Sequence, residues 1–155
     1  MLHEIPPTDI AATRAQRAKL DDVITHCRDA AKTFRAAAAL PSVHREELMA
    51  ISRRRSSFAH RLSGFTRDPD RANTRGSFGG LARRSLLDAR AWLLGQTHLG
   101  DSLAACLRAD ANAARSYSSA LHLDWSGDIG DVLEEQLDEI ETSSTHVRSL
   151  RSHLW

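Results

Sequence analysis

Two cysteine-centred segments carry the side chains whose types and spacing make them the best candidates for a functional site. The segment CRDAAKTF begins at Cys27, and the segment CLRADANA begins at Cys106. When the two cysteines are aligned, Asp110 falls opposite Ala31. Both positions continue a helical spacing of apolar residues, so both are predicted to face a core. A carboxylate buried there without a partner would cost several kcal/mol or stay protonated.

Arg55 is the candidate partner of Asp110, because it lies on or close to the apolar stripe of its own helix. We therefore expect a buried Arg55–Asp110 ion pair in the core. Glu141, Tyr117 or Ser144 would complete its hydrogen bonds. The alternative is that one or both charged side chains turn to the surface of the protein.

No other group of residues predicts catalysis, so the chain is not expected to be an enzyme. His26 precedes Cys27 directly and therefore points away from the core face that the cysteine occupies. The glycine-rich GSFGG at Gly76 lacks the lysine and the preceding strand of a phosphate-binding loop. Cys27 and Cys106 are expected to act as small core residues, although a disulfide stays open as the alternative.

Five helical segments are predicted to position these side chains, after a loose N-terminal arm over residues 1–12. Pro41 ends the first helix, and Ser42 is the expected N-cap of the second. The predicted helices cover Thr13–Leu40, Ser42–Ser63, Leu81–Leu94, Asp101–Leu121 and Ile129 to the C-terminus. The residues expected to face inward are Leu20, Val23, Ile24, Cys27, Ala31, Phe34, Ala38, Leu48, Ile51, Phe58, Leu62, Leu103, Cys106, Asp110, Ala113, Tyr117, Ala120, Leu133, Leu137, Ile140, Ser144, Val147 and Leu154.

The composition and the order of these segments predict an all-α fold. Hydrophobic residues make up 41% of the 155 residues but aromatic residues only 5%, and alanine, leucine and arginine are strong helix formers. We expect a single four-helix-bundle domain over residues 13–155, built from helical hairpins at about 13–64 and 101–155. The crossover at 65–100 carries the short extra helix. This long crossover gives the helices a ferritin-like rather than a simple up-down order.

The charge balance limits the classes of partner. With 21 basic and 20 acidic residues, the net charge is +1, so neither nucleic acid nor a membrane is an expected partner. The weaker alternative is nucleic-acid binding through the basic runs Arg53–Arg55 and Arg83–Arg84. No secretory signal and no membrane-spanning stretch are evident, so the expected location is cytoplasmic.

Five stretches together resemble the ferritin-like four-helix-bundle family of unknown function, DUF2383. They are LDDVITHCRDAAKTFRAAA, FAHRL, SFGGLARRSLLDARAWL, ACLRADANAARSYSSAL and EEQLDEIETSSTHVRSLR, which span about residues 20–151. The resemblance implies a ferritin-like fold, with a Glu at positions 31 and 110 and an inward His at position 144. Ferritin-like di-metal sites use about six such ligands from four helices.

This chain departs from that ligand pattern at most positions. It carries Ala31, Asp110 and Ser144, and the inward pair on the second helix is Arg55 and Phe58. No metal site is therefore expected, and the chain is predicted to be a degenerate member of the family. The alternative is an atypical iron or manganese site that uses Asp110, Glu141 and a nearby histidine.

The predicted function is a non-enzymatic bundle that serves as a structural, stress-related or protein-interaction module. The alternative is a metal-binding redox or storage protein with atypical ligands. A homo-oligomer or an unknown protein partner is expected to contact the large aromatic residues Trp92, Trp125 and Trp155, because large exposed aromatics are typical of interaction surfaces.

Overall fold

The computed structural model describes residues 7–66 and 99–154, with side chains from Arg14 onward. These residues form four α-helices and no strand, which confirms the predicted all-α class for the described part. The helices are α1 (Pro7–Ala38), α2 (Arg45–Ser63), α5 (Leu99–Leu121) and α6 (Ile129–Ser152). The helix predicted at 81–94 lies outside the described residues.

Three predicted helix starts differ from the observed ones, and for α5 the difference is from Asp101 to Leu99. Helix α1 begins at Pro7 rather than near Thr13, so residues 7–12 of the expected arm are helical. Proline suits a first helical position, because the N–H that it lacks would have no partner there. The N-cap of α2 is His44, not Ser42, and it makes no side-chain cap hydrogen bond. Ser42 instead accepts a hydrogen bond from the His44 backbone N–H (3.1 Å) in the preceding turn.

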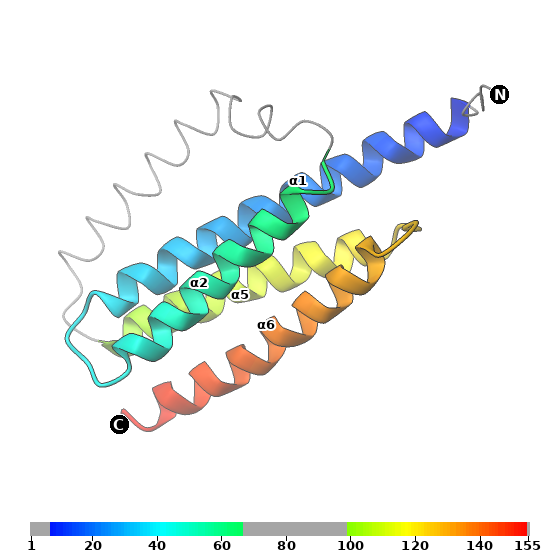
Figure 1. The fold of residues 1–155 in the computed structure, drawn as a ribbon. Coiled ribbons are helices and arrows are strands. Elements are labelled where there is room, and N and C mark those ends of the chain that lie inside the picture. The colour runs from blue at the N-terminus through cyan, green and yellow to red at the C-terminus, as the bar shows by residue number, and fades with distance from the viewer. Residues whose placement is uncertain (1–6, 67–98, 155) are drawn as a thin grey trace.

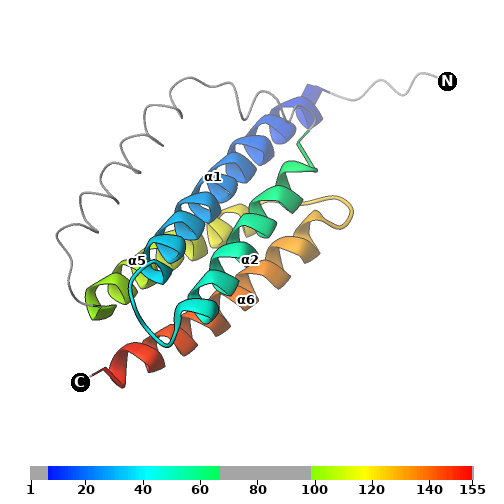
Figure 2. The same cartoon turned by 60° about the vertical axis from the view of Figure 1, so that its left-hand side comes forward.

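The four helices form a bundle in which each hairpin is antiparallel (Figure 1). Helix α2 ends at the end of the bundle where α1 begins, whereas α5 starts at the opposite end, so α2 and α5 run in the same direction (Figure 2). Helix α1 packs closely against α2 and α5, and α5 packs against α6. The backbones of α2 and α6 approach each other less closely.

The turn between α5 and α6 contains the one described glycine whose backbone requires glycine. Gly127 has a φ of 69°, in the left-handed region that residues with a Cβ rarely adopt. Near this turn, Trp125 is partly buried against the core and donates a hydrogen bond from Nε1 to the Ala120 carbonyl (2.8 Å). Because the indole packs inward, Trp125 covers part of the core, while its partial exposure leaves its predicted place on an interaction surface a prediction.

The apolar core consists of two clusters, one toward each end of the bundle. The Tyr117 cluster contains Leu20, Val23, Ile24, Cys27, Phe58, Ala59, Leu62, Ala113, Tyr117, Ala120, Val132, Leu133 and Ile140. The Phe34 cluster contains Phe34, Ala37, Ala38, Leu48, Ile51, Leu103, Cys106 and Val147. On every helix, the residues between the two clusters form a separate layer, and this layer holds both buried charges of the core, Arg55 and Asp110.

Most side chains predicted to face inward are buried. Leu137 is partly buried. The prediction that Leu154 faces inward is wrong, because it lies beyond the end of α6 and is 40% exposed. None of the described helices is both long and apolar enough to cross a membrane.

Candidate functional site

The centre of the bundle holds an ion pair between α2 and α5. Arg55 Nε donates to Asp110 Oδ1 and Arg55 Nη2 donates to Asp110 Oδ2, each at 2.9 Å. Both side chains are 0% exposed. Two parallel N–H···O bonds in this fork geometry are the strongest arrangement that an arginine and a carboxylate can form. The predicted Arg55–Asp110 pair is therefore present, and neither residue turns to the surface.

Two serines of α6 complete the hydrogen bonds of the pair. Ser144 donates to Asp110 Oδ2 (3.2 Å), as one of the three predicted alternatives. Ser143 accepts a further hydrogen bond from Arg55 Nη2. Tyr117 bonds elsewhere, and Glu141 is exposed on α6 and is not a partner of Asp110. The site thus draws one charge from each hairpin and its remaining hydrogen bonds from α6.

The guanidinium of Arg55 also lies between two phenylalanine rings. Its central carbon is 5.8 Å from the ring centre of Phe34 and 5.6 Å from that of Phe58, within the range of cation–π attraction. Phe34 belongs to one apolar cluster and Phe58 to the other. Arg55 Nη1 has no hydrogen-bond partner among the described residues, so the aromatic faces supply part of its compensation.

A second buried polar chain runs across α1, α5 and α6 within the Tyr117 cluster. Cys27 Sγ and Tyr117 Oη are 3.1 Å apart, and Tyr117 Oη donates to Gln136 Oε1 (2.7 Å). Because the Tyr117 hydroxyl donates its single proton to the hydrogen bond with Gln136, the Cys27 thiol is the donor in the hydrogen bond with Tyr117. Burial, and next the adjacent Cys27, raise the pKa of the Tyr117 hydroxyl well above its usual range. This chain is therefore a neutral structural network at physiological pH.

The two cysteines are free and buried, one in each apolar cluster, so the disulfide left open by the sequence is absent. Burial is the main cause that raises the pKa of the Cys27 thiol to about 11, while the hydrogen bond with Tyr117 opposes it. Burial and the charge of Asp110 raise the pKa of the Cys106 thiol to about 12. Thiols of this kind are poor nucleophiles, as expected of core residues.

Ion pairs bridge the wider gap between α2 and α6. Glu47 of α2 contacts His146 of α6 and also the His44 ring (3.3 Å). The hydrogen bond with His146 is the main cause that lowers the pKa of the Glu47 carboxyl. Further along, the exposed pairs are Arg54–Glu139 (3.3 Å) and Arg61–Glu135 (3.5 Å). Exposed pairs contribute little individually, so the buried pair remains the principal polar contact of the bundle.

The structure does not bring the proposed metal ligands together. Asp110 Oδ1 and Oδ2 both accept hydrogen bonds from Arg55, while Glu141 faces outward. Of the histidines, His60 and His146 are exposed and His26 is partly exposed. Across residues 7–66 and 99–154, no group of three or more His, Cys, Asp or Glu side chains is placed to hold a metal ion.

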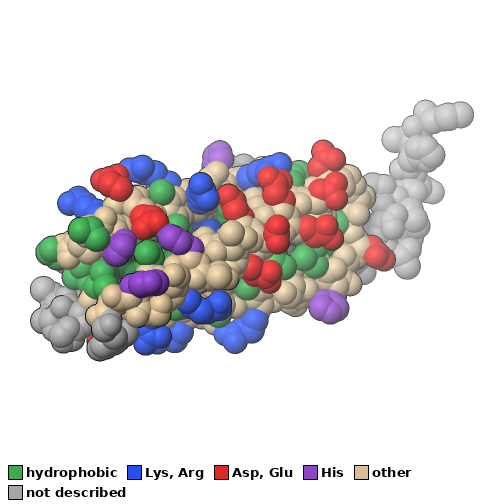
Figure 3. All heavy atoms as spheres, turned by 90° about the horizontal axis from the view of Figure 1, so that it is seen from below, with side chains coloured by type: hydrophobic (Ala, Val, Ile, Leu, Met, Phe, Trp, Pro, Cys, Tyr) green, Lys and Arg blue, Asp and Glu red, His purple; other side chains and the backbone are tan. Residues whose placement is uncertain are grey.

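The surface carries its charges unevenly along the bundle. Figure 3 shows acidic side chains gathered over the half nearer the α5–α6 turn, with basic side chains and histidines more frequent over the other half. Within the run Arg53–Arg55, the first two arginines are exposed and the third is buried, so the run is not a continuous basic surface. Arg83, Arg84, Trp92 and Trp155 lie outside the described residues.

Three polar residues of the site were not predicted from the sequence. Ser143 lies three residues after Ile140, and Gln136 lies four residues before it, so both continue the apolar stripe of α6. This helical spacing was the feature of the sequence that indicated an inward position for both residues. Ser52, buried on α2, donates to the Ala31 carbonyl (2.7 Å) and ties α1 to α2 beside the ion pair.

Comparison of the chain with protein-family models, curated proteins and solved structures finds no match. The resemblance to the ferritin-like family of unknown function therefore stays a prediction.

Proposed function

We propose that this chain is a non-enzymatic helical bundle of ferritin-like architecture, in which the Arg55–Asp110 ion pair replaces a central metal site. The observation that carries the proposal is the position of the pair. It lies between the two apolar clusters, fully buried, with one charge from each hairpin. Metal ligands of a ferritin-like bundle would project into this same central layer.

The parallel course of α2 and α5 supports the ferritin-like part of the proposal (Figures 1 and 2). An up-down bundle with short connections would place consecutive helices antiparallel throughout. Helices α2 and α5 instead run in the same direction, and 35 residues (64–98) separate Ser63 from Leu99 in the sequence. The parallel direction of α2 and α5 thus agrees with a ferritin-like helix order. Many helical bundles outside one family could share this direction.

The physical role of the pair is to hold the two hairpins in one alignment. Docking of the two hairpins removes both charges from water, and only the alignment that brings Arg55 to Asp110 gives each charge its partner. A rigid bundle of this kind suits a structural or protein-interaction role, in a homo-oligomer or with another protein. A stress-related role is kept as part of the same proposal.

The second candidate is a metal-binding redox or storage protein that uses iron or manganese. Its ligands would have to include Asp110 and Glu141. The described geometry favours it less, because the Arg55 guanidinium occupies the carboxylate oxygens that a metal would need. A positive charge at that distance also repels a divalent cation.

Metal content and solution mass, measured together on protein purified without chelator, test the proposal. We expect iron, manganese and zinc well below one equivalent per chain after growth in metal-supplemented medium. Stoichiometric metal that is lost on Asp110→Ala, with the fold intact by circular dichroism, would establish the second candidate instead. Glu139→Ala, which removes an exposed carboxylate outside the central layer, is the matched control.

A further inference from the structure

A surface hollow between α1 and α2 combines positive charge with room for a small ligand. Its volume is about 210 Å³, and it is lined by Arg28, Ala31, Lys32, Arg35, Ser52 and Ser56. Three of the six lining side chains are cations, and two are hydroxyl groups.

The three cations follow from the spacing of residues along α1. Arg28, Lys32 and Arg35 are separated by four and three residues, which places them on one face of the helix. None of the three forms an ion pair with another described residue. Asp29 lies close enough to Lys32 for the charge of Lys32 to lower its carboxyl pKa, while burial raises that pKa. The lining itself contains three cations and no carboxylate, so the hollow carries a positive excess.

Ala31 and Ser52 form the buried floor of the hollow. Ser52 donates its hydroxyl proton to the Ala31 carbonyl, so the floor presents a methyl group and an oxygen already in use. Ser56 at the exposed rim makes no hydrogen bond to a described residue and is free to donate one. The small side chain at position 31 leaves the space open, because a longer one would project into it.

We propose that this hollow binds the phosphate group of a small organic phosphate monoester. Arg28, Lys32 and Arg35 supply charge-assisted donors for the phosphate oxygens, and the Ser56 hydroxyl supplies a neutral one. A volume of about 210 Å³ exceeds a single phosphate group, so the floor and the methylene stems of the cations accommodate an attached organic group. This inference is independent of the proposed metal-free function.

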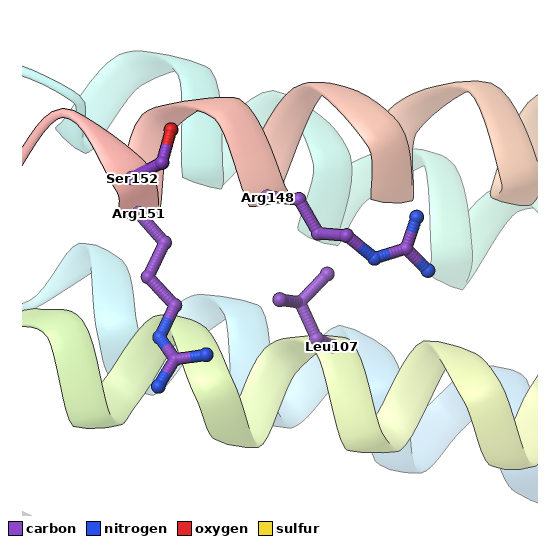
Figure 4. Close-up of a pocket in the computed structure, with 4 residues that line it drawn as sticks. All are labelled: Leu107, Arg148, Arg151 and Ser152. Atoms are coloured by element: carbon purple, nitrogen blue, oxygen red, sulfur yellow. The ribbon is translucent and has the colours of Figure 1, made fainter.

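A second basic hollow between α5 and α6 provides an internal comparison. Its volume is about 280 Å³, and it is lined by Leu107, Arg148, Arg151 and Ser152. In Figure 4, the two arginines extend from α6 on either side of Leu107. It offers two cations rather than three and is more open to solvent, so an anion there would be held more weakly.

Binding is measured by following backbone amide resonances of the full chain by NMR during titration with sodium phosphate, and separately with phenyl phosphate. Sodium chloride keeps the ionic strength constant. We expect saturable shifts at residues 28–35 and 52–56. We also expect at least about fivefold tighter binding of phenyl phosphate than of inorganic phosphate, because the ring occupies the rest of the hollow.

The variant Lys32→Gln/Arg35→Gln should weaken phenyl phosphate binding by about tenfold or more, because two charge-assisted contacts are lost. Arg53→Gln is the matched control, since Arg53 is an exposed arginine of α2 outside the hollow, and it should leave binding unchanged. Arg148→Gln/Arg151→Gln should also leave it unchanged.

Three results would overturn the proposal. One is a titration in which the shifts do not saturate, or in which Arg53→Gln abolishes binding as fully as Lys32→Gln/Arg35→Gln does. Another is binding that maps to the Arg148 and Arg151 hollow. Equal affinity for inorganic phosphate and phenyl phosphate would overturn the assignment of an organic ligand in favour of the free ion.

Discussion

Replacing Asp110 with alanine is the most direct perturbation of the central ion pair. The change removes both acceptors of the Arg55 fork and the acceptor of Ser144, while the guanidinium stays 0% exposed. Breaking a buried pair from one side costs about 3–5 kcal/mol, because the remaining charge has no partner and no water. We expect Asp110→Ala to destabilise the bundle by this amount.

Urea and thermal unfolding followed by circular dichroism measure the effect. For a chain of this length, each kcal/mol corresponds to roughly 2–4 °C, so the midpoint should fall by roughly 6–20 °C. Ser144→Ala is the matched control, since it removes only the longest of the three hydrogen bonds to Asp110. That variant should lose about 1 kcal/mol.

The double variant Arg55→Met/Asp110→Leu separates loss of the pair from loss of the fold. Well-packed apolar residues in place of a buried pair are often neutral or stabilising, so the double variant should be more stable than Asp110→Ala alone. This comparison remains decisive even where the single variant does not fold. A midpoint within about 2 °C of the parent for Asp110→Ala, or a double variant no more stable than it, would refute the reasoning.

Three further outcomes follow from the buried networks and the α2–α6 contacts. Tyr117→Phe should destabilise by about 1–3 kcal/mol in urea unfolding, because it leaves two buried hydrogen-bonding groups unpaired; an unchanged midpoint would contradict the network. With thiol pKa values of about 11 for Cys27 and about 12 for Cys106, an aromatic disulfide reagent at pH 8 should label the native protein at least about a hundredfold more slowly than the urea-unfolded chain, and equal rates would contradict the buried placement. The contact with His146 lowers the Glu47 pKa from 4.5, so its stabilisation is present above that pH and is lost as the pH falls through the lower folded value. Glu47→Gln should therefore cost up to about 1 kcal/mol at pH 6 and progressively less as the pH falls below 4.5, and a cost that does not shrink in acid would contradict it.

Helical periodicity was enough to predict both the elements and the residues of the central pair. Arg55 and Asp110 lie in phase with the apolar residues of their helices, and an arginine and a carboxylate buried in one core have few other partners. The contribution of Ser143 was harder to predict, because it depends on the rotation of α6 about its axis, which the apolar stripe fixes only to within one residue. Helix ends were the least predictable. The preference of Ser42 for an N-cap did not decide where α2 begins, since its hydroxyl bonds within the preceding turn.

The position of the pair explains why a bundle core would keep two charges at all. Leucine, alanine and isoleucine layers tolerate a slide of one helical turn, because each apolar layer would meet another of similar shape. A slide of one turn moves α2 by about 5.4 Å along α5 and would separate atoms that are now 2.9 Å apart. Both charges would then be buried without partners, at a cost that apolar contacts elsewhere cannot offset. We therefore infer that the Arg55–Asp110 pair disfavours the misaligned bundles that the two apolar clusters alone would permit.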